Sequence, residues 1–168
     1  MPLLRLETRR SNIAHMIFSR IDNDKREVLL FLKKNVLATI STVNPQNLQP
    51  ESALVAFCEL DALEILITTL KGSRKYENLL KNDKVALVIG WEADPKRWAT
   101  LQYEGKAVEV SAYEESFYKK LFLKKEGSPC TEVFFQKSDM KLFKITPTWI
   151  GFSRFPQNQK PKVIELRF

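Results

Sequence analysis

The sequence predicts a mainly β protein (α+β): a small antiparallel barrel, closed or half-closed, with a few short helices. Short segments rich in β-branched residues follow one another with turn residues between them, which is typical of an antiparallel meander. One later segment, Trp98–Val110, is long enough to bend around a barrel, and Gly105 in its middle is expected to form a bulge or a barrel corner. The strand–helix alternation of a parallel sheet is missing, as are a GxGxxG sequence and a Walker motif.

Each expected element has its own local signal. Asp22 and Asp24 favour a helix start and Lys33–Lys34 its end, because the helix dipole attracts anions to one terminus and cations to the other. Helical spacing predicts further helices over 74–80 and 112–125. The nearly continuous apolar run over 85–91 indicates a strand buried on both faces. In all, six strands are expected, over 35–43, 52–58, 63–69, 85–91, 98–110 and 140–152, the last interrupted at Thr146–Pro147.

The chain is expected to form one domain with an extension at each end. Its 168 residues and 44% hydrophobic content suit a single packed core. We assign residues 1–34 to an N-terminal arm and helix, 35–155 to the barrel and 156–168 to a C-terminal tail. The longest apolar run is far shorter than the ~20 residues of a membrane span. Charges interrupt the N-terminal segment where a secretory signal needs apolar residues, so a cytoplasmic protein with no membrane partner is expected.

The net charge of +7 lies at the two ends of the chain. Residues 1–34 carry eight Lys or Arg and four Asp or Glu, and residues 141–168 carry six and one. The central residues 35–140 carry thirteen and fifteen, so the body of the domain is mildly acidic. A nucleic-acid-binding domain usually gathers its cations and aromatic residues on one folded face. This distribution argues against a nucleic-acid partner and favours solvated basic termini.

Few side chains could carry catalysis by themselves. The single histidine, His15, lies in the N-terminal arm, which argues against Ser-His-Asp and Cys-His mechanisms. One histidine and two cysteines are too few to build a zinc or iron site, so no metal is expected. The acidic residues have no spacing that marks a catalytic pair. The sequence therefore names no catalytic residue.

The segment from Thr68 to Lys75 carries the most specific signal. Ser73 is placed as the N-cap of the following helix, which puts Arg74 and Lys75 in the first helical turn. Cations are unfavourable at that terminus unless an anion binds there, where free backbone N–H groups and the guanidinium converge. Thr68 and Thr69 add hydroxyls at the end of the preceding strand. The spacing is consistent with a phosphate site and also with an exposed basic turn.

Three ordered stretches carry a family resemblance. The first is VLATISTVNPQNLQPESALVAF, the second is ITTLKGSRKYENLLKNDKVALVIGW, with its strand-end threonine, Gly-Ser-Arg-Lys and N-L-x-x-N, and the third is LQYEGKAVEVS. Together they resemble the first hairpin, the phosphate-binding turn and the long strand of the pyridoxamine 5′-phosphate oxidase-like FMN-binding split barrels. The resemblance runs from about Asn35 to Ser111. It implies a six-stranded antiparallel split β-barrel.

The resemblance also implies a cofactor, a partner and site residues. Ser73, Arg74 and Lys75 match the residues that hold the FMN phosphate in the family, Thr68 matches the strand-end threonine that faces it, and Thr69 lies beside it. The family's flavin lies in a groove between two subunits, so a homodimer is implied. Relatives with this fold use the deazaflavin F420 instead, which is the alternative cofactor, or bind haem.

Three residues of the long strand, Trp98, Thr100 and Gln102, share one strand face by the period of two. One hypothesis is that these side chains contact the edge of the flavin. The other is that they form an ordinary half-exposed strand face.

The function implied is that of a flavin-dependent oxidoreductase acting on a small molecule. Authentic pyridoxamine-phosphate oxidases carry an Arg and a Lys on the second strand and end in Trp-x-x-x-Arg-Leu. This chain has SALVAF on that strand and ends in KPKVIELRF, which argues against vitamin B6 as its substrate. A non-catalytic flavin-binding or stress-response protein and an F420-dependent reductase are the alternatives, and a basic-tailed nucleic-acid binder is a remote one.

Overall fold

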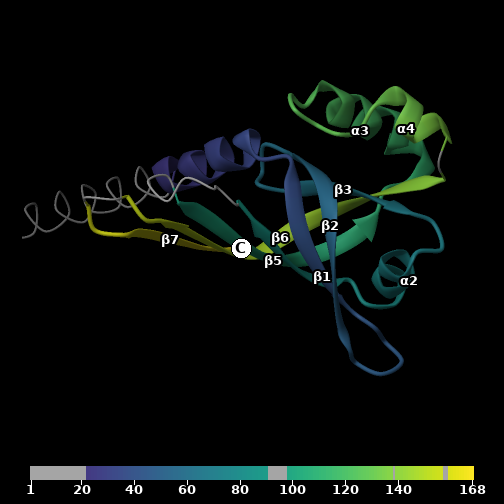
Figure 1. Ribbon diagram of the computed structural model, residues 1–168, viewed down its shortest axis with the longest axis horizontal. Coiled ribbons are helices and arrows are strands. Elements are labelled where there is room, and N and C mark those ends of the chain that lie inside the picture. Colours follow the sequence, from purple (N-terminus) through teal and green to yellow (C-terminus); the bar gives the residue numbers. More distant parts are fainter. Residues whose placement is uncertain (1–21, 91–97, 138, 157–158) are drawn as a thin grey trace, which may run out of the picture.

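The computed structural model describes residues 22–90, 98–137, 139–156 and 159–168. In these residues seven strands form one antiparallel sheet in the order β3-β2-β1-β4-β5-β6-β7, and β3 also pairs with β6. The second pairing closes six strands into a barrel and leaves β7 outside it (Figure 1). The predicted six-stranded antiparallel barrel is therefore confirmed. The strands are β1 Leu37–Val43, β2 Pro50–Glu59, β3 Ile65–Leu70, β4 Lys84–Ile89, β5 Ala99–Glu109, β6 Met140–Arg154 and β7 Lys162–Arg167.

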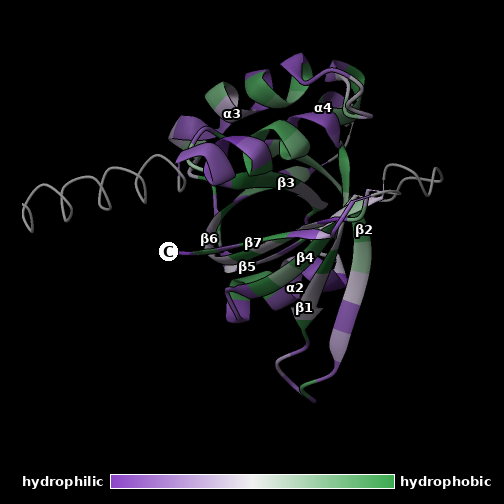
Figure 2. Cartoon of the chain, turned by 90° about the vertical axis from the view of Figure 1, so that its left-hand side faces the viewer, coloured by the Kyte–Doolittle hydropathy of each residue, from purple (hydrophilic) through white to green (hydrophobic). Residues whose placement is uncertain are grey.

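Four helices accompany the barrel in the described part of the chain. They span residues 22–34, α2 Arg74–Lys81, α3 Ala112–Lys124 and α4 Glu132–Lys137. The first three were predicted and are confirmed, whereas α4 was not predicted. Figure 1 shows α2 on one side of the end of β3 and the α3–α4 pair on the other, and Figure 2 gives the same arrangement from a second direction.

Hydrophobic side chains fill the barrel and one patch of its outer surface. Along β1, β4 and β5 alternate residues point inward, which is the expected pattern of a half-buried sheet, whereas β3 is buried on both faces. A second cluster lies outside the barrel, where α3 and α4 cover β2 and β3. Cys58 and Leu66 face outward there and are nevertheless buried, against Phe122 and Cys130.

The prediction that the fourth strand is buried on both faces is wrong. Along β4, Val85, Leu87 and Ile89 are buried, whereas Ala86 and Val88 are exposed. Helices cover the outer face of the sheet over β2 and β3 and leave the outer face of β4 uncovered. The apolar run in β4 therefore includes side chains that form an exposed apolar surface on the outside of the barrel. Trp91, the end of the predicted strand, lies outside the described residues.

The pairing of β5 with β6 is irregular where the sequence predicted a bulge. The register between β5 and β6 shifts between Glu104 and Gly105. A Cβ on Gly105 would lie 2.5 Å from the carbonyl oxygen of Thr146, so glycine is needed for this close approach. Pro147 pairs with Gly105 at the bulge, and β6 continues through it as a single strand. The predicted interruption of β6 is therefore only a local irregularity.

The C-terminal segment assigned to a tail contains β7, a strand that the prediction missed. β7 pairs with the end of β6, and it buries Ile164 and Leu166. The helix over 22–34 is fastened to the same end, because Glu27 forms ion pairs with Arg154 (3.3 Å) and with Lys162. Residues 1–21 of the predicted N-terminal arm lie outside the described residues.

Lys125, at the end of α3, connects that helix with β2 and with the helix over 22–34. Its buried amine forms an ion pair with Glu59 of β2 and donates a hydrogen bond to the carbonyl oxygen of Leu32, 3.2 Å away, in the last turn of the helix over 22–34. The amine also lies 4.0 Å from the centre of the Phe57 ring. Burial lowers the pKa of this amine, and the hydrogen bond to Glu59 opposes that shift. The end of α3 is thereby fixed to the barrel wall.

Tyr103 is expected to stabilise the closed barrel from the inside. Its side chain is fully buried, and its hydroxyl lies 3.0 Å from the carbonyl oxygens of Leu63, before β3, and Ile145, on β6. Tyr103→Phe leaves these buried oxygens without that partner, so we expect the free energy of unfolding to fall by about 1–2 kcal/mol. Urea denaturation measures it. Tyr113→Phe, at a residue that is 95% exposed, is the matched control, and equal stabilities for the two variants would contradict the assignment.

Candidate functional site

The turn between β3 and α2 forms the centre of the candidate site. Gly72 adopts a positive φ of 78° in this turn, a conformation that suits glycine. Ser73 then caps α2, because its hydroxyl accepts a hydrogen bond from the backbone N–H of Tyr76 at 3.3 Å. The same hydroxyl lies 3.0 Å from Thr69 Oγ1. The predicted N-cap is confirmed, and it joins the helix start to the strand end.

A hollow of about 280 Å³ opens beside this turn. Thr68, Thr69 and Lys75 give it a polar end, with two hydroxyls and one amine. Apolar residues of β1 and β2 form one wall, and residues before and within α4 form the other. These apolar or weakly polar lining residues are Leu37, Leu54, Val55, Ala56, Leu70, Pro129, Cys130, Phe134 and Met140. Such a hollow suits a ligand with an anionic group at one end and an apolar body.

Lys75 is half-buried at the polar end of the hollow. Burial lowers the pKa of its amine, because desolvation disfavours the charged form. A bound anion would oppose that shift and would be attracted by the amine. Burial likewise raises the pKa of the Cys130 thiol in the same hollow, which favours the neutral thiol.

Arg74 lies on a different side of the helix start from Lys75. Its guanidinium is 3.5 Å from Glu51 Oε1, its side chain is 82% exposed, and it lines a separate hollow of about 180 Å³ with Asn44 and Asn78. The structure thus brings together Thr68, Thr69 and Lys75, with Ser73 bonded to Thr69. It does not place Arg74 in that group.

The three residues predicted on the long strand lie far from this hollow. Thr68 pairs with Leu142 of β6 and Thr100 pairs with Ser153, eleven residues further along the same strand. At about 3.3 Å per residue this is roughly 35 Å measured along the strand. Gln102 and Thr100 lie on the outer face of β5, and Trp98 stacks on Phe155 at a centroid distance of 5.2 Å. One chain does not bring these residues to the hollow.

Sequence reasoning missed the residues that complete the hollow. Leu54 and Ala56 face it from β2, and their alternation along the strand could have indicated a shared outer face. Cys130 and Phe134 come from the region of α4, which is only six residues long and gives little periodic signal. Glu51 lies one residue before the predicted strand over 52–58, and no local pattern links it to Arg74, which follows it by 23 residues.

No group of three or more His, Cys, Asp or Glu side chains among the described residues is placed to hold a metal ion. None of the described helices has the length and apolar character needed to cross a membrane.

Comparisons with solved structures place the fold among several kinds of protein. General stress protein 26 from Bacillus anthracis has 22% identity and a TM-score of 0.56, over 84% of this chain and 98% of that one. An F420 reductase has 25% identity and a TM-score of 0.57, over 71% and 92%. A heme-binding protein from Mycobacterium smegmatis has 13% identity and a TM-score of 0.64, over 84% of this chain and 56% of that one.

Sequence comparison gives the family. No curated protein matches the chain. The family model described as pyridoxamine 5′-phosphate oxidase matches residues 24–154, which include the helix over 22–34 almost completely, the whole barrel, and all of α2, α3 and α4. The chain belongs to the pyridoxamine 5′-phosphate oxidase family.

Proposed function

We propose that the protein binds FMN in the hollow beside α2 and acts as a flavin-dependent oxidoreductase on a small molecule. The observation that carries this proposal is the two-sided lining of the hollow. Thr68, Thr69 and Lys75 present two hydroxyls and an amine at one end, and apolar side chains of β1, β2 and α4 form the rest. FMN has the matching chemistry, with a phosphate at one end and a largely apolar ring system at the other. Family membership supports the same assignment.

The residues of this chain would bind and orient the cofactor. Lys75 would contact the phosphate through its charge, and Thr68 and Thr69 through hydroxyl donors, with Ser73 positioning Thr69. The backbone N–H groups at the start of α2 add a favourable electrostatic field. Bound FMN would supply hydride or electron transfer at its ring system, so the protein's contribution is anchoring, orientation and local electrostatics.

We propose that the protein is a homodimer and that two copies meet on the outer face of the barrel. Six uncharged residues in two register rows form this neutral face: Thr39, Ser41, Ser52, Leu54, Ala86 and Val88. Leu54 is 67% exposed and Val88 is 50% exposed. Charged side chains would be costly in a buried contact, so an uncharged exposed face suits a partner.

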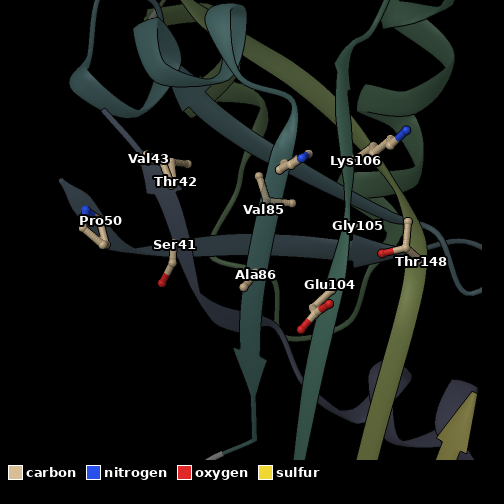
Figure 3. A pocket seen from close by; sticks show the side chains of 11 residues that line it. Ser41, Thr42, Val43, Pro50, Val85, Ala86, Glu104, Gly105, Lys106 and Thr148 are labelled. Atoms are coloured by element: carbon tan, nitrogen blue, oxygen red, sulfur yellow. The ribbon is translucent and has the colours of Figure 1, made fainter. Parts of the chain in front are cut away.

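The neutral face connects the proposed partner to the hollow. Leu54 belongs to both, so a second copy on this face would border the flavin. Gln102 adjoins Val88 in the β4–β5 pairing, so an isologous contact would bring the partner's Gln102 to this surface. Figure 3 shows a groove of about 390 Å³ at the border of the neutral face, where Ser41 and Ala86 adjoin charged side chains. These are Lys84, Glu104 and Lys106.

The deazaflavin F420 is the second candidate cofactor. It carries a phosphate as well, and one structural neighbour is an F420 reductase with 25% identity. Titration with each cofactor separates the two. A flavin-binding stress protein without catalysis is supported by the likeness to general stress protein 26, and failure of single substrates to sustain NAD(P)H oxidation would favour it.

The cofactor assignment has a direct spectroscopic test. The purified protein, mixed with excess FMN and desalted, is expected to keep a flavin absorption band near ~450 nm, because the hollow holds both ends of the cofactor. NAD(P)H oxidation with candidate acceptors then tests catalysis. A colourless protein after this treatment would contradict FMN binding, and retention of the deazaflavin alone would select the second candidate.

Lys75 is expected to account for much of the phosphate affinity. Lys75→Ala should weaken FMN binding about 10- to 100-fold, the usual worth of a hydrogen bond to a charged group, and leave riboflavin binding unchanged. Arg74→Ala combined with Lys75→Ala should strip the cofactor and leave the fold intact. Fluorescence titration measures both affinities. Lys81→Ala, on the same helix and outside the hollow, is the control, and an equal effect there would contradict a specific contact.

The proposed dimer is tested by placing a charge on the neutral face. Val88→Lys should convert the dimer to a monomer and reduce FMN retention, because a buried unpaired charge opposes association. Val163→Lys, at a 61% exposed position of β7, should leave the dimer unchanged. Light scattering after size exclusion measures the mass. A Val88→Lys protein that remains dimeric would place the interface elsewhere.

A further inference from the structure

We propose that Glu51 is an internal competitor for the phosphate: its carboxylate holds Arg74 away from the hollow, and a bound phosphate gains the Arg74 guanidinium only when this ion pair breaks. This inference rests on the proposed FMN site. It makes Glu51 a residue that sets the affinity for a phosphorylated ligand, although Glu51 does not line the hollow that the ligand would occupy.

Glu51 is held in place from two sides. Asn78, which is 4% exposed, donates from Nδ2 to Glu51 Oε2 at 3.0 Å and to Thr42 Oγ1 at 3.1 Å. Asn44 Nδ2 lies 3.5 Å from Glu51 Oε1, and the Glu51 side chain is only 15% exposed. The carboxylate is therefore part of a fixed network between α2, β1 and β2.

Arg74 is the movable member of the ion pair. Its side chain is 82% exposed, and its guanidinium makes a single 3.5 Å contact with Glu51. Arg74 directly follows the cap residue Ser73, and Lys75, the next residue, lines the hollow. Rotation about the side-chain bonds of Arg74 is thus enough to exchange the carboxylate for a phosphate near the start of α2.

The competition determines what Arg74 can add to binding. A phosphate gains the guanidinium contact only when the contact with Glu51 is lost, so the two interactions partly cancel. An exposed ion pair of this kind is worth up to about 1 kcal/mol, which corresponds to about a fivefold change in affinity. Without the carboxylate, Arg74 would be available to the phosphate at no such cost.

The test compares two charge-neutralising substitutions on FMN affinity. Glu51→Gln is expected to tighten FMN binding about 2- to 5-fold and to leave riboflavin affinity unchanged. Glu77→Gln removes the same charge from the first turn of α2, where no ion pair with Arg74 is formed among the described residues, and should have a smaller effect. Fluorescence titration gives all affinities, and circular dichroism confirms that each variant is folded.

A double-mutant cycle tests whether the effect passes through Arg74. In an Arg74→Ala background, Glu51→Gln should no longer change FMN affinity. An undiminished gain in that background would overturn the proposal, because the carboxylate would then repel the phosphate directly. Glu51→Asp keeps the charge and withdraws the carboxylate by one methylene, so it should give a smaller gain, and it serves as the second variant if Glu51→Gln does not fold.

The outcomes distinguish a failure of the Glu51 role from a failure of the flavin site. If FMN binds the wild-type protein and Glu51→Gln behaves like Glu77→Gln, the flavin site stands and the role of Glu51 is refuted. If neither FMN nor riboflavin binds any of these proteins, the flavin site itself is wrong, and the role of Glu51 falls with it.

Discussion

The antiparallel pairing of β3 with β6 is the contact on which the rest of the structure depends. It runs over six residue pairs, from Ile65 with Ile145 to Leu70 with Met140. α2 follows β3 directly in the sequence, and α4 comes just before β6. Closing the barrel therefore brings the start of α2 and the region of α4 to the same place. The hollow between them is a product of barrel closure, and no single segment contains it.

The lining of the hollow comes partly from one local segment and partly from distant parts of the chain. The polar end of the hollow comes from one continuous segment, Thr68 to Lys75, in which a turn, a helix cap and a strand end follow one another. The apolar walls come from β1, β2 and the region of α4, which only the tertiary structure brings together. Anchoring chemistry is thus encoded locally, and the shape around it depends on packing.

The same division explains what the sequence could predict. The N-cap at Ser73, the bulge at Gly105 and the meander of the first three strands have local signals, and the structure confirms them. β7 lies in a polar, proline-bearing segment, and its partner is the far end of β6. Its strand character depends on that pairing, so the local pattern failed.

In two further places the direction of a side chain in the structure differs from the sequence prediction. The apolar composition of β4 did not reveal that Val88 faces outward, because composition records apolarity and not which elements cover a face. Adjacent cations at a helix start were expected to converge, but Arg74 and Lys75 point to different hollows because a carboxylate from β2 lies beside one of them. The direction of a long side chain depends on such distant partners.

The placement of β7 also bears on how the protein behaves when it is concentrated. Among the described strands, β7 is the one with an unpaired edge, because β3 at the other end of the sheet closes on β6. Unpaired edges are templates on which further chains can add strands and build fibres. β7 carries Lys162, Glu165 and Arg167 as exposed charges, and the ion pair from Lys162 to Glu27 fastens its beginning to a helix. Open-ended polymerisation through this edge is thereby disfavoured.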